Sequence, residues 1–293
     1  MADQTHKPKA KTVKPLEEAL GIALKKVLNS HGYPFHESVI RVISKVRTRS
    51  LWVPWVPEFP VQVNGQHTRI DLVLTNQKNN IYLVCECKRS NPAVANWCFA
   101  KSCFFPNASL AQHCYMDALQ RQPHEGGLIS SYVRQLTTSD RLFQVAVEVR
   151  GGVTGDDSVK GRGQIEEAAT QVCRGLNGLI DSLYQRGLPR LGAGNIFFLP
   201  VVITTAKLWA TDTDISLAST ETGEIEDASV SVNPMKWLWY QYPQSPGLKH
   251  SAPNNFCSHD LREILYHEFV RPIAIARPDG LDELLSASMW EMF

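Results

Sequence analysis

Two carboxylates and one amine lie close together in residues 69–89, RIDLVLTNQKNNIYLVCECKR. Asp71 belongs to one short hydrophobic run, Glu86 and Lys88 end a second run, and a polar stretch at residues 75–80 separates the two. The runs are rich in Val, Ile, Leu and Tyr, which predicts a β-hairpin. Alternate residues of a strand share a face, so Glu86 and Lys88 should project together. Such a set favours a divalent cation held by carboxylate oxygens, with the Lys beside a bound water.

The same residues resemble the active-site signature of the PD-(D/E)xK nuclease superfamily. In that signature an Asp on the second core strand precedes an acidic-x-Lys triplet on the third, matched here by Asp71 and by Glu86-Cys87-Lys88. The resemblance implies an α/β fold with a restriction-endonuclease-like core, α-β-β-β-α-β, whose central mixed sheet is flanked by helices. It also implies an enzyme that hydrolyses the phosphodiester bonds of nucleic acid, DNA rather than RNA, in phage defence, restriction or repair.

The resemblance assigns a role to each residue of the set. Asp71 and Glu86 would hold Mg²⁺, for which Mn²⁺ could substitute, and the backbone carbonyl of Cys87 would be a third ligand. Lys88 would orient or deprotonate the attacking water, or neutralise the charge that develops at the phosphate. The alternative is an exposed strand on which Lys88 forms a salt bridge with an acid.

Helices before and after the hairpin offer further polar groups. Many members of the superfamily add a Glu from the helix before the first strand, and Glu37 is favoured because its helix leads directly into that strand. Glu17 and Glu18 on the preceding helix compete with it, and an acid in a first helical turn is also favoured by the macrodipole alone. Some members place a Gln on the helix after the third strand. Here Gln164 and Gln171 are seven residues apart and share a helix face.

Cys85 and Cys87 alternate with the acid and the Lys, so they should project to the opposite face of the strand. We expect that face to meet the long helix that begins at Gln164, which would make both thiols small buried hydrophobes. The chain has seven Cys, an odd number at irregular spacing. This pattern favours a reducing compartment over a disulfide framework.

The overall charge is balanced, with 30 Lys and Arg against 29 Asp and Glu. Contact with nucleic acid would therefore depend on local patches. The chain has no run of 18 apolar residues and its N-terminus has no apolar signal core, which predicts a cytoplasmic protein without a membrane partner. A homodimer, or a partner protein of a defence system, remains open.

The composition of the N-terminus and the resemblance together divide the chain into three parts. Residues 1–14 hold four Lys and few apolar side chains, which predicts a disordered basic arm. Residues 15–206 should form the nuclease-like core, with an insertion at about residues 91–162, and residues 207–293 a C-terminal elaboration packed on it. The first predicted helix begins at residue 16 and ends at a stop signal at residues 31–32. Further helices are predicted at residues 35–46, 164–186 and 259–270, and near residues 108–120 and 127–136. The predicted strands outside the hairpin are residues 52–63, 142–149, 195–205 and 235–242.

Two functions remain in competition at this point. The first is the metal-dependent nuclease. The second is a catalytically silent protein of the same fold that binds nucleic acid or another protein. The complete set of Asp71, Glu86 and Lys88 favours the enzyme, because a silent descendant has no reason to retain all three.

Overall fold

The computed structural model describes most of the chain after the N-terminal arm. The arm predicted for residues 1–14 lies outside the described residues. These are 16–46, 52–78, 80–92, 95–101, 114–121, 128–136, 141–149, 163–186, 195–213, 215–225, 230–252 and 261–290.

A large mixed β-sheet forms the centre of the molecule. In pairing order its strands are β1 (Trp52–Val63), β2 (Gln66–Asn76), β3 (Ile81–Lys88), β9 (Ile196–Thr204), β13 (Val270–Ala276), β12 (Trp237–Pro243) and β7 (Leu142–Phe143), with β5 (Cys114–Arg121) and β6 (Leu128–Leu136) beside this path. The first three strands are antiparallel, because tight connections join them, and β3 runs parallel to β9. The protein is therefore an α/β protein, as the sequence predicts.

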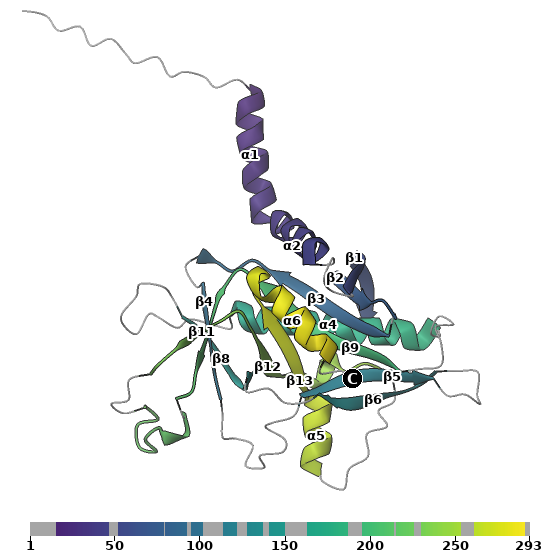
Figure 1. Cartoon of the computed structure of the whole chain (residues 1–293), viewed down its shortest axis with the longest axis vertical. Coiled ribbons are helices and arrows are strands. Elements are labelled where there is room, and N and C mark those ends of the chain that lie inside the picture. The colour runs from purple at the N-terminus through teal and green to yellow at the C-terminus, as the bar shows by residue number, and fades with distance from the viewer. Residues whose placement is uncertain are drawn as a thin grey trace, which may run out of the picture.

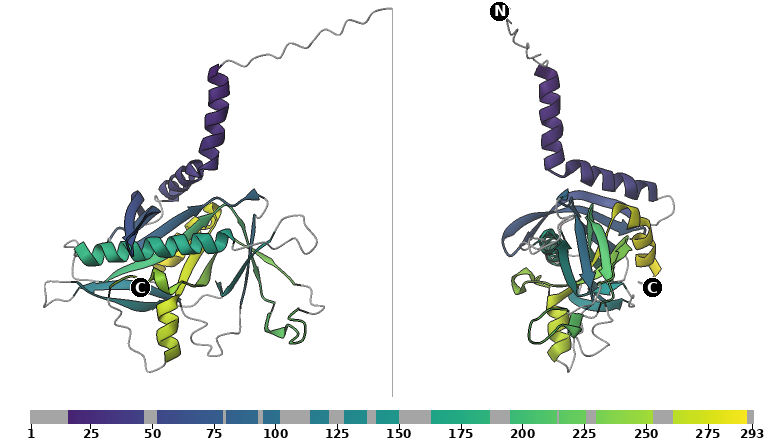
Figure 2. Two further views of the ribbon diagram at one scale, coloured as in Figure 1. Left: turned by 180° about the vertical axis from the view of Figure 1, so that it is seen from behind. Right: turned by 90° about the vertical axis from the view of Figure 1, so that its left-hand side faces the viewer.

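Helices cover both faces of this sheet. The helices α2 (Tyr33–Val46) and α6 (Leu281–Trp290) lie on one face and α4 (Gln164–Arg186) lies on the other (Figure 1 and Figure 2). Strand alternation determines which side chains meet them: Leu83 belongs to the α2 and α6 layer, and Val84 to the α4 layer. All nine residues of β9 are buried, which confirms the prediction of a central strand covered on both sides.

The helix α4 lies unusually close to the sheet. A Cβ atom at Gly178 would be 2.8 Å from the Cβ of Val61, and one at Gly175 would be 2.9 Å from Cγ1 of Ile70. Both glycines therefore permit an approach that no other residue allows. The approach packs the middle of α4 against β1 and β2.

A second sheet lies beside the first. Its strands are β11 (Asn233–Met235), β10 (Lys207–Thr211), β4 (Asn96–Ala100) and β8 (Val145–Val149). The single strand predicted at residues 142–149 is therefore wrong, because a bend after Phe143 divides it between the two sheets. The C-terminal region also contributes more than an elaboration, since β12 and β13 belong to the central sheet.

The helices predicted near residues 108–120 and 127–136 are also incorrect in the part that the structure describes. These residues form β5 and β6, which pair with each other, and β5 pairs with β9 from Asp117 opposite Phe198 onwards. Pairing between segments so far apart in the sequence overrides local helical periodicity. The helix predicted at residues 259–270 is present as α5 (Leu261–Phe269).

The first helix, α1 (Leu16–Ser30), extends away from the rest of the molecule. Every view of the ribbon shows it standing clear of both sheets (Figure 1 and Figure 2), and none of its residues is buried. Its apolar stripe therefore covers no described part of the core. Among the described helices, α1 included, none combines the length and apolar character needed to span a membrane.

Candidate active site

One pocket collects most of the residues that the sequence singles out. It has a volume of about 480 Å³ and opens where the turn between α1 and α2, the middle of β1 and β2, the end of β3 and the start of α4 meet. Its lining includes Asp71, Glu86, Cys87, Lys88, Gln164 and Gln171, together with His36 and Glu58, which the sequence does not predict.

The carboxylate of Asp71 is fixed by the backbone of the neighbouring strand. The antiparallel pairing of β2 and β3 places Leu72 opposite Cys85, so Asp71 and Glu86 follow at the next position. There Oδ2 of Asp71 accepts a hydrogen bond of 2.7 Å from the N–H of Cys87. This contact continues the strand pairing through a side chain and holds Asp71 in the lining of the pocket.

Burial raises the pKa of both carboxyl groups, and the charge of Asp71 raises that of Glu86 further. Burial raises the pKa of Asp71, and the hydrogen bond from Cys87 and the charge of His36 partly offset this effect. Burial and then the charge of Asp71 raise the pKa of Glu86 to about 8. Two acids in a site of low dielectric thus repel one another, and a cation bound between them would relieve that repulsion.

Lys88 completes the predicted set and is directed toward α4. Its Nζ lies 2.9 Å from Oε2 of Glu167, in the first turn of that helix. The charge of Lys88 also lowers the pKa of Glu86, although less than burial raises it. The amine is therefore within electrostatic reach of the acid two residues before it, as the alternation of the strand predicts.

Glu58 is a site residue that sequence reasoning missed. It lies on β1, between Pro57 and Phe59, which pair with Leu72 and Ile70 of β2, so it is next to Asp71. Its charge raises the pKa of both Asp71 and Glu86. The backbone φ of Glu58 is 50°, a strained value for a residue with a Cβ, and such strain is concentrated at functional sites.

The sequence does contain a signal for Glu58. It is the sole acid in the Pro-rich segment VPWVPEFPVQV, whose other residues are typical of an apolar strand. Its Oε1 lies 4.0 Å from Nδ1 of His36, a buried residue of α2. Helix α2 therefore supplies a His to the pocket, not the predicted Glu.

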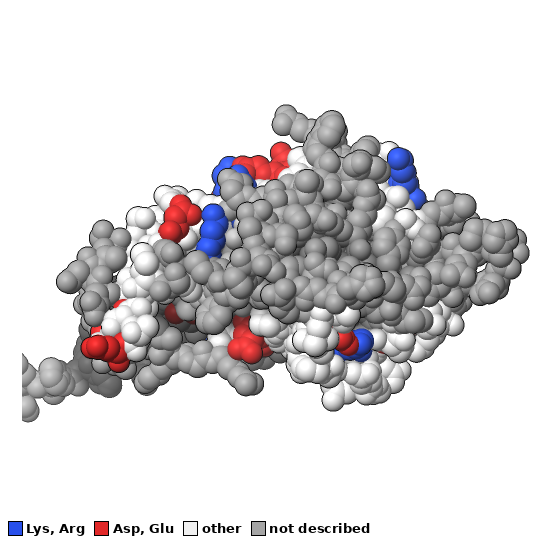
Figure 3. Space-filling model, turned by 90° about the horizontal axis from the view of Figure 1, so that it is seen from below, with Lys and Arg blue, Asp and Glu red and all other residues white. Residues whose placement is uncertain are grey.

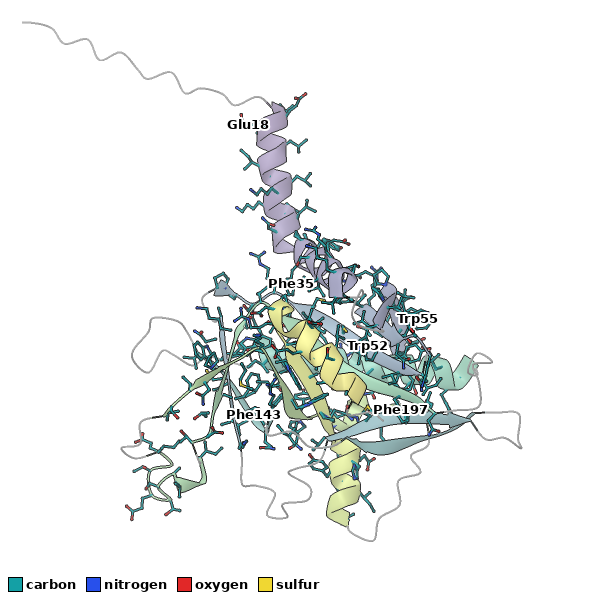
Figure 4. The ribbon with its side chains drawn as sticks, in the orientation of Figure 1. Glu18, Phe35, Trp52, Trp55, Phe143 and Phe197 are labelled. Carbon is teal, nitrogen blue, oxygen red and sulfur yellow. The ribbon has the colours of Figure 1, made fainter. Side chains whose placement is uncertain are left out.

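The three helical acids considered for this role do not reach the site. Glu37 is exposed and lies outside the pocket lining, because α2 buries Phe35, His36, Val39 and Ile43 and so turns Glu37 outward. Glu17 and Glu18 are exposed on α1, and Figure 4 places Glu18 at the far end of that helix. Glu17 and Glu18 therefore both lie outside the pocket lining.

Both glutamines of α4 line the pocket, as their spacing predicts. Oε1 of Gln164 accepts a hydrogen bond of 3.0 Å from the backbone N–H of Asn91. Oε1 of Gln171 is buried and has no hydrogen-bond partner among the described residues. A buried acceptor without a partner is costly unless a ligand supplies a donor or a positive charge.

Cys85 and Cys87 do not face the helix that the sequence suggested, although Cys87 also lines the pocket. They pack in the layer of α2 and α6, whereas α4 covers the opposite face. Alternation separates the two faces of a strand but does not say which helix covers which face. Burial raises the pKa of both thiols, so neither is a reactive thiolate.

The described residues do not contain a preformed metal site made of side chains alone. No group of three or more His, Cys, Asp or Glu side chains is arranged there to hold an ion. Any metal would thus depend on the two carboxylates, the backbone and its own water or substrate ligands. Comparisons with protein-family models, with curated proteins and with solved structures give no match to this chain.

Proposed function

We propose that the protein is a metal-dependent nuclease of the PD-(D/E)xK type. The observation that carries the proposal is the pocket in which Asp71 and Glu86 lie beside Lys88, with the pKa of Glu86 raised to about 8 by burial and by Asp71. Perturbed acids next to an amine in a cavity are typical of catalytic sites. The proposal extends to the restriction-endonuclease-like core.

The order of the elements supports that fold assignment. The helix α2 is followed by β1, β2 and β3 and, after an insertion that contains β4 to β8, by α4 and β9. Without that insertion this is the α-β-β-β-α-β order that the resemblance implies. The four strands are also adjacent in the sheet in that same sequence. The acids and the Lys lie on the second and third strands of this unit, where the superfamily carries its signature.

The donor set suits Mg²⁺. This ion is usually held by one or two carboxylates together with water and substrate phosphates, and it rarely has a cage made entirely of protein side chains. Asp71 and Glu86 would hold it, with the carbonyl of Cys87 as a backbone ligand, and Mn²⁺ could substitute. When bound, the metal would supply charge neutralisation at the phosphate and a more acidic water.

The remaining groups have roles that follow from their positions. Lys88 would orient the attacking water or stabilise the developing charge. The unpaired carbonyl of Gln171 would accept a hydrogen bond from that water or from the substrate. Glu58 adds a third negative charge beside the two acids, which strengthens the preference for a cation.

Among the described residues, basic side chains form no broad patch on the face seen from below. Figure 3 shows the acidic and basic side chains of the described residues interspersed on that face. Basic groups close to the pocket that could contact nucleic acid are the exposed Arg69, which pairs with Glu58, and the exposed Arg89, which lines the pocket. DNA is the favoured substrate by resemblance.

The test is a cleavage assay on plasmid, linear double-stranded and single-stranded substrates, with Mg²⁺, Mn²⁺ or EDTA. The proposal expects cleavage with either metal and none with EDTA. Cleavage that persists in EDTA, or metal-dependent cleavage that survives loss of both Asp71 and Lys88, contradicts it.

A catalytically silent protein of the same fold is the second candidate, and the ion pair of Lys88 with Glu167 favours it. The pair gives the amine a partner within the protein, as expected where Lys88 has a structural role. This candidate expects nucleic acid or a protein to bind without cleavage under any metal condition. Equilibrium binding measured alongside the cleavage assay separates the two.

A further inference from the structure

The helix α1 presents an apolar surface that no described element covers. Its four leucines are 83%, 66%, 55% and 42% exposed at Leu16, Leu20, Leu24 and Leu28. A helix of 15 residues is marginal in water without tertiary packing. Since α1 stands clear of the sheets in Figure 1 and Figure 2, the stabilising contact must come from outside the described body.

The leucines form a single ridge. They are spaced four residues apart, so they follow one i, i+4 row along the helix. The adjacent row consists of Ala19, Ala23 and Val27, whose small side chains leave a shallow groove beside the ridge. A helix that carries both a ridge and a groove can pack against an identical helix, each ridge lying in the other's groove.

The pattern is also symmetric about Ile22. In an antiparallel pair centred there, Leu16 would face Leu28 of the second copy, and Leu20 would face its Leu24. Such a two-fold pairing uses the same patch on both copies.

The charges of the helix select the antiparallel direction. Glu17 and Glu18 lie in the first turn, and Lys25 and Lys26 lie in the second half. Antiparallel packing sets the acidic end of one helix beside the basic half of the other. Parallel packing would instead set like charges and like helix dipole ends together.

We propose that α1 is a homodimerisation element that pairs antiparallel with the α1 of a second copy of this chain. The leucine ridge supplies the contact and the row of small residues supplies the groove that receives it. The proposal is independent of the nuclease chemistry, because no residue of the ridge lines the pocket.

Sedimentation equilibrium of the full chain over a range of concentrations tests the pairing. The wild type should show a monomer–dimer equilibrium. Leu24→Glu should raise the dimer dissociation constant about tenfold or more, because each dimer loses two buried leucines. The matched control is Ile22→Glu, since Ile22 is 52% exposed on the same helix but lies off the ridge. It should leave the dissociation constant close to that of the wild type.

Cross-linking of variants that each carry one added Cys tests the direction. In the antiparallel pair the two copies of residue 23 are only ~3 Å apart along the axis, whereas the two copies of residue 16 are ~18 Å apart. A short bis-maleimide should therefore link Ala23→Cys more efficiently than Leu16→Cys, against the wild type as background. A wild type that sediments as a monomer at the highest soluble concentration overturns the proposal. This holds equally if α1 is then found to pack against the body of its own chain or to bind lipid vesicles. Equal weakening by both Glu variants, or preferential linking at residue 16, overturns it as well.

Discussion

The ammonium of Lys88 lies 2.9 Å from Oε2 of Glu167, so an ion pair joins the end of β3 to the first turn of α4. The side chain of Lys88 is 17% exposed and that of Glu167 is 58% exposed. Glu167 lies outside the pocket lining, yet its charge is one of those that raise the pKa of Glu86. The acid on α4 is thus placed to position Lys88 and to influence the half-buried Glu86 at the same time.

Loss of the catalytic groups should remove activity without unfolding the protein. We expect Lys88→Ala and Asp71→Ala each to lower Mg²⁺-dependent cleavage by about 10² to 10⁴, the range for loss of a proton-transfer or water-orienting group. Single-turnover cleavage rates and far-ultraviolet circular dichroism measure the two properties. Glu37→Ala is the control, because this exposed acid lies outside the pocket and its loss should leave the rate unchanged. Full activity in both pocket variants would contradict the assigned roles.

Removal of the positioning acid should have a smaller effect with a distinct pH signature. We expect Glu167→Gln to lower the rate about two- to fivefold, since a partly exposed ion pair is worth roughly 1 kcal/mol or less. It also removes one charge that raises the pKa of Glu86, so the acidic limb of the pH–rate profile should move to lower pH.

Glu166→Gln is the matched control for this shift, because Glu166 is an exposed acid of the same helical turn. A shift of the acidic limb to higher pH in the Glu167 variant, or the same shift in both variants, would exclude the positioning role.

The site can be predicted from sequence only as far as local spacing allows. Asp71, Glu86 and Lys88 are linked by one hairpin, so alternation along two strands is enough to bring them to one pocket. Glu58 and His36 come from β1 and α2, and their approach depends on sheet register and on the rotation of a helix. The prediction of Glu37 is one residue away from the His that faces inward.

The fold shows the same division between local and distant information. The long periodic helix at residues 164–186 and the apolar strand β9 are predicted closely, because each carries its own pattern. The strands β5 and β6 are predicted as helices, since β5 pairs with β9, about 80 residues later in the chain, and β6 pairs with β5. The positions of β12 and β13 inside the central sheet depend on the same kind of distant pairing.

The raised pKa of Glu86 predicts a stability that falls with increasing pH in metal-free protein. The folded state keeps this proton up to about pH 8, whereas the unfolded chain loses it near the ordinary value of 4.5. The contribution of Glu86 to the free energy of unfolding is therefore fully present below pH 4.5 and is lost as the pH rises through 8. Its size is on the order of a few kcal/mol. Urea unfolding in EDTA at several pH values measures the slope.

Glu86→Gln should flatten this part of the profile, because its side chain does not ionise. Excess Mg²⁺ or Mn²⁺ should restore stability to the wild type at high pH, by roughly 2.7 kcal/mol at a hundredfold excess over the dissociation constant. The variant should gain much less from the metal. A wild-type profile that rises between pH 5 and 8 in EDTA, with the same slope in the variant, would show that Glu86 does not titrate as described.

The close approach of α4 to the sheet predicts that Gly178→Ala destabilises the protein and impairs the site. The new Cβ would lie 2.8 Å from the Cβ of Val61, so the helix must move outward or the strand must shift. We expect a loss of about 1–3 kcal/mol in the free energy of unfolding, the usual cost of overpacking a core. Since α4 carries Glu167 and both glutamines, the cleavage rate of the folded variant should fall as well.

Gly21→Ala is the matched control for this packing effect. Gly21 is also a helical glycine, but nothing lies within 4 Å of the position that a Cβ would take there. The higher helix propensity of Ala should therefore leave stability equal or slightly increased. Urea unfolding of both variants gives the comparison, and equal stability of Gly178→Ala and wild type would mean that α4 does not pack as closely as its glycines indicate.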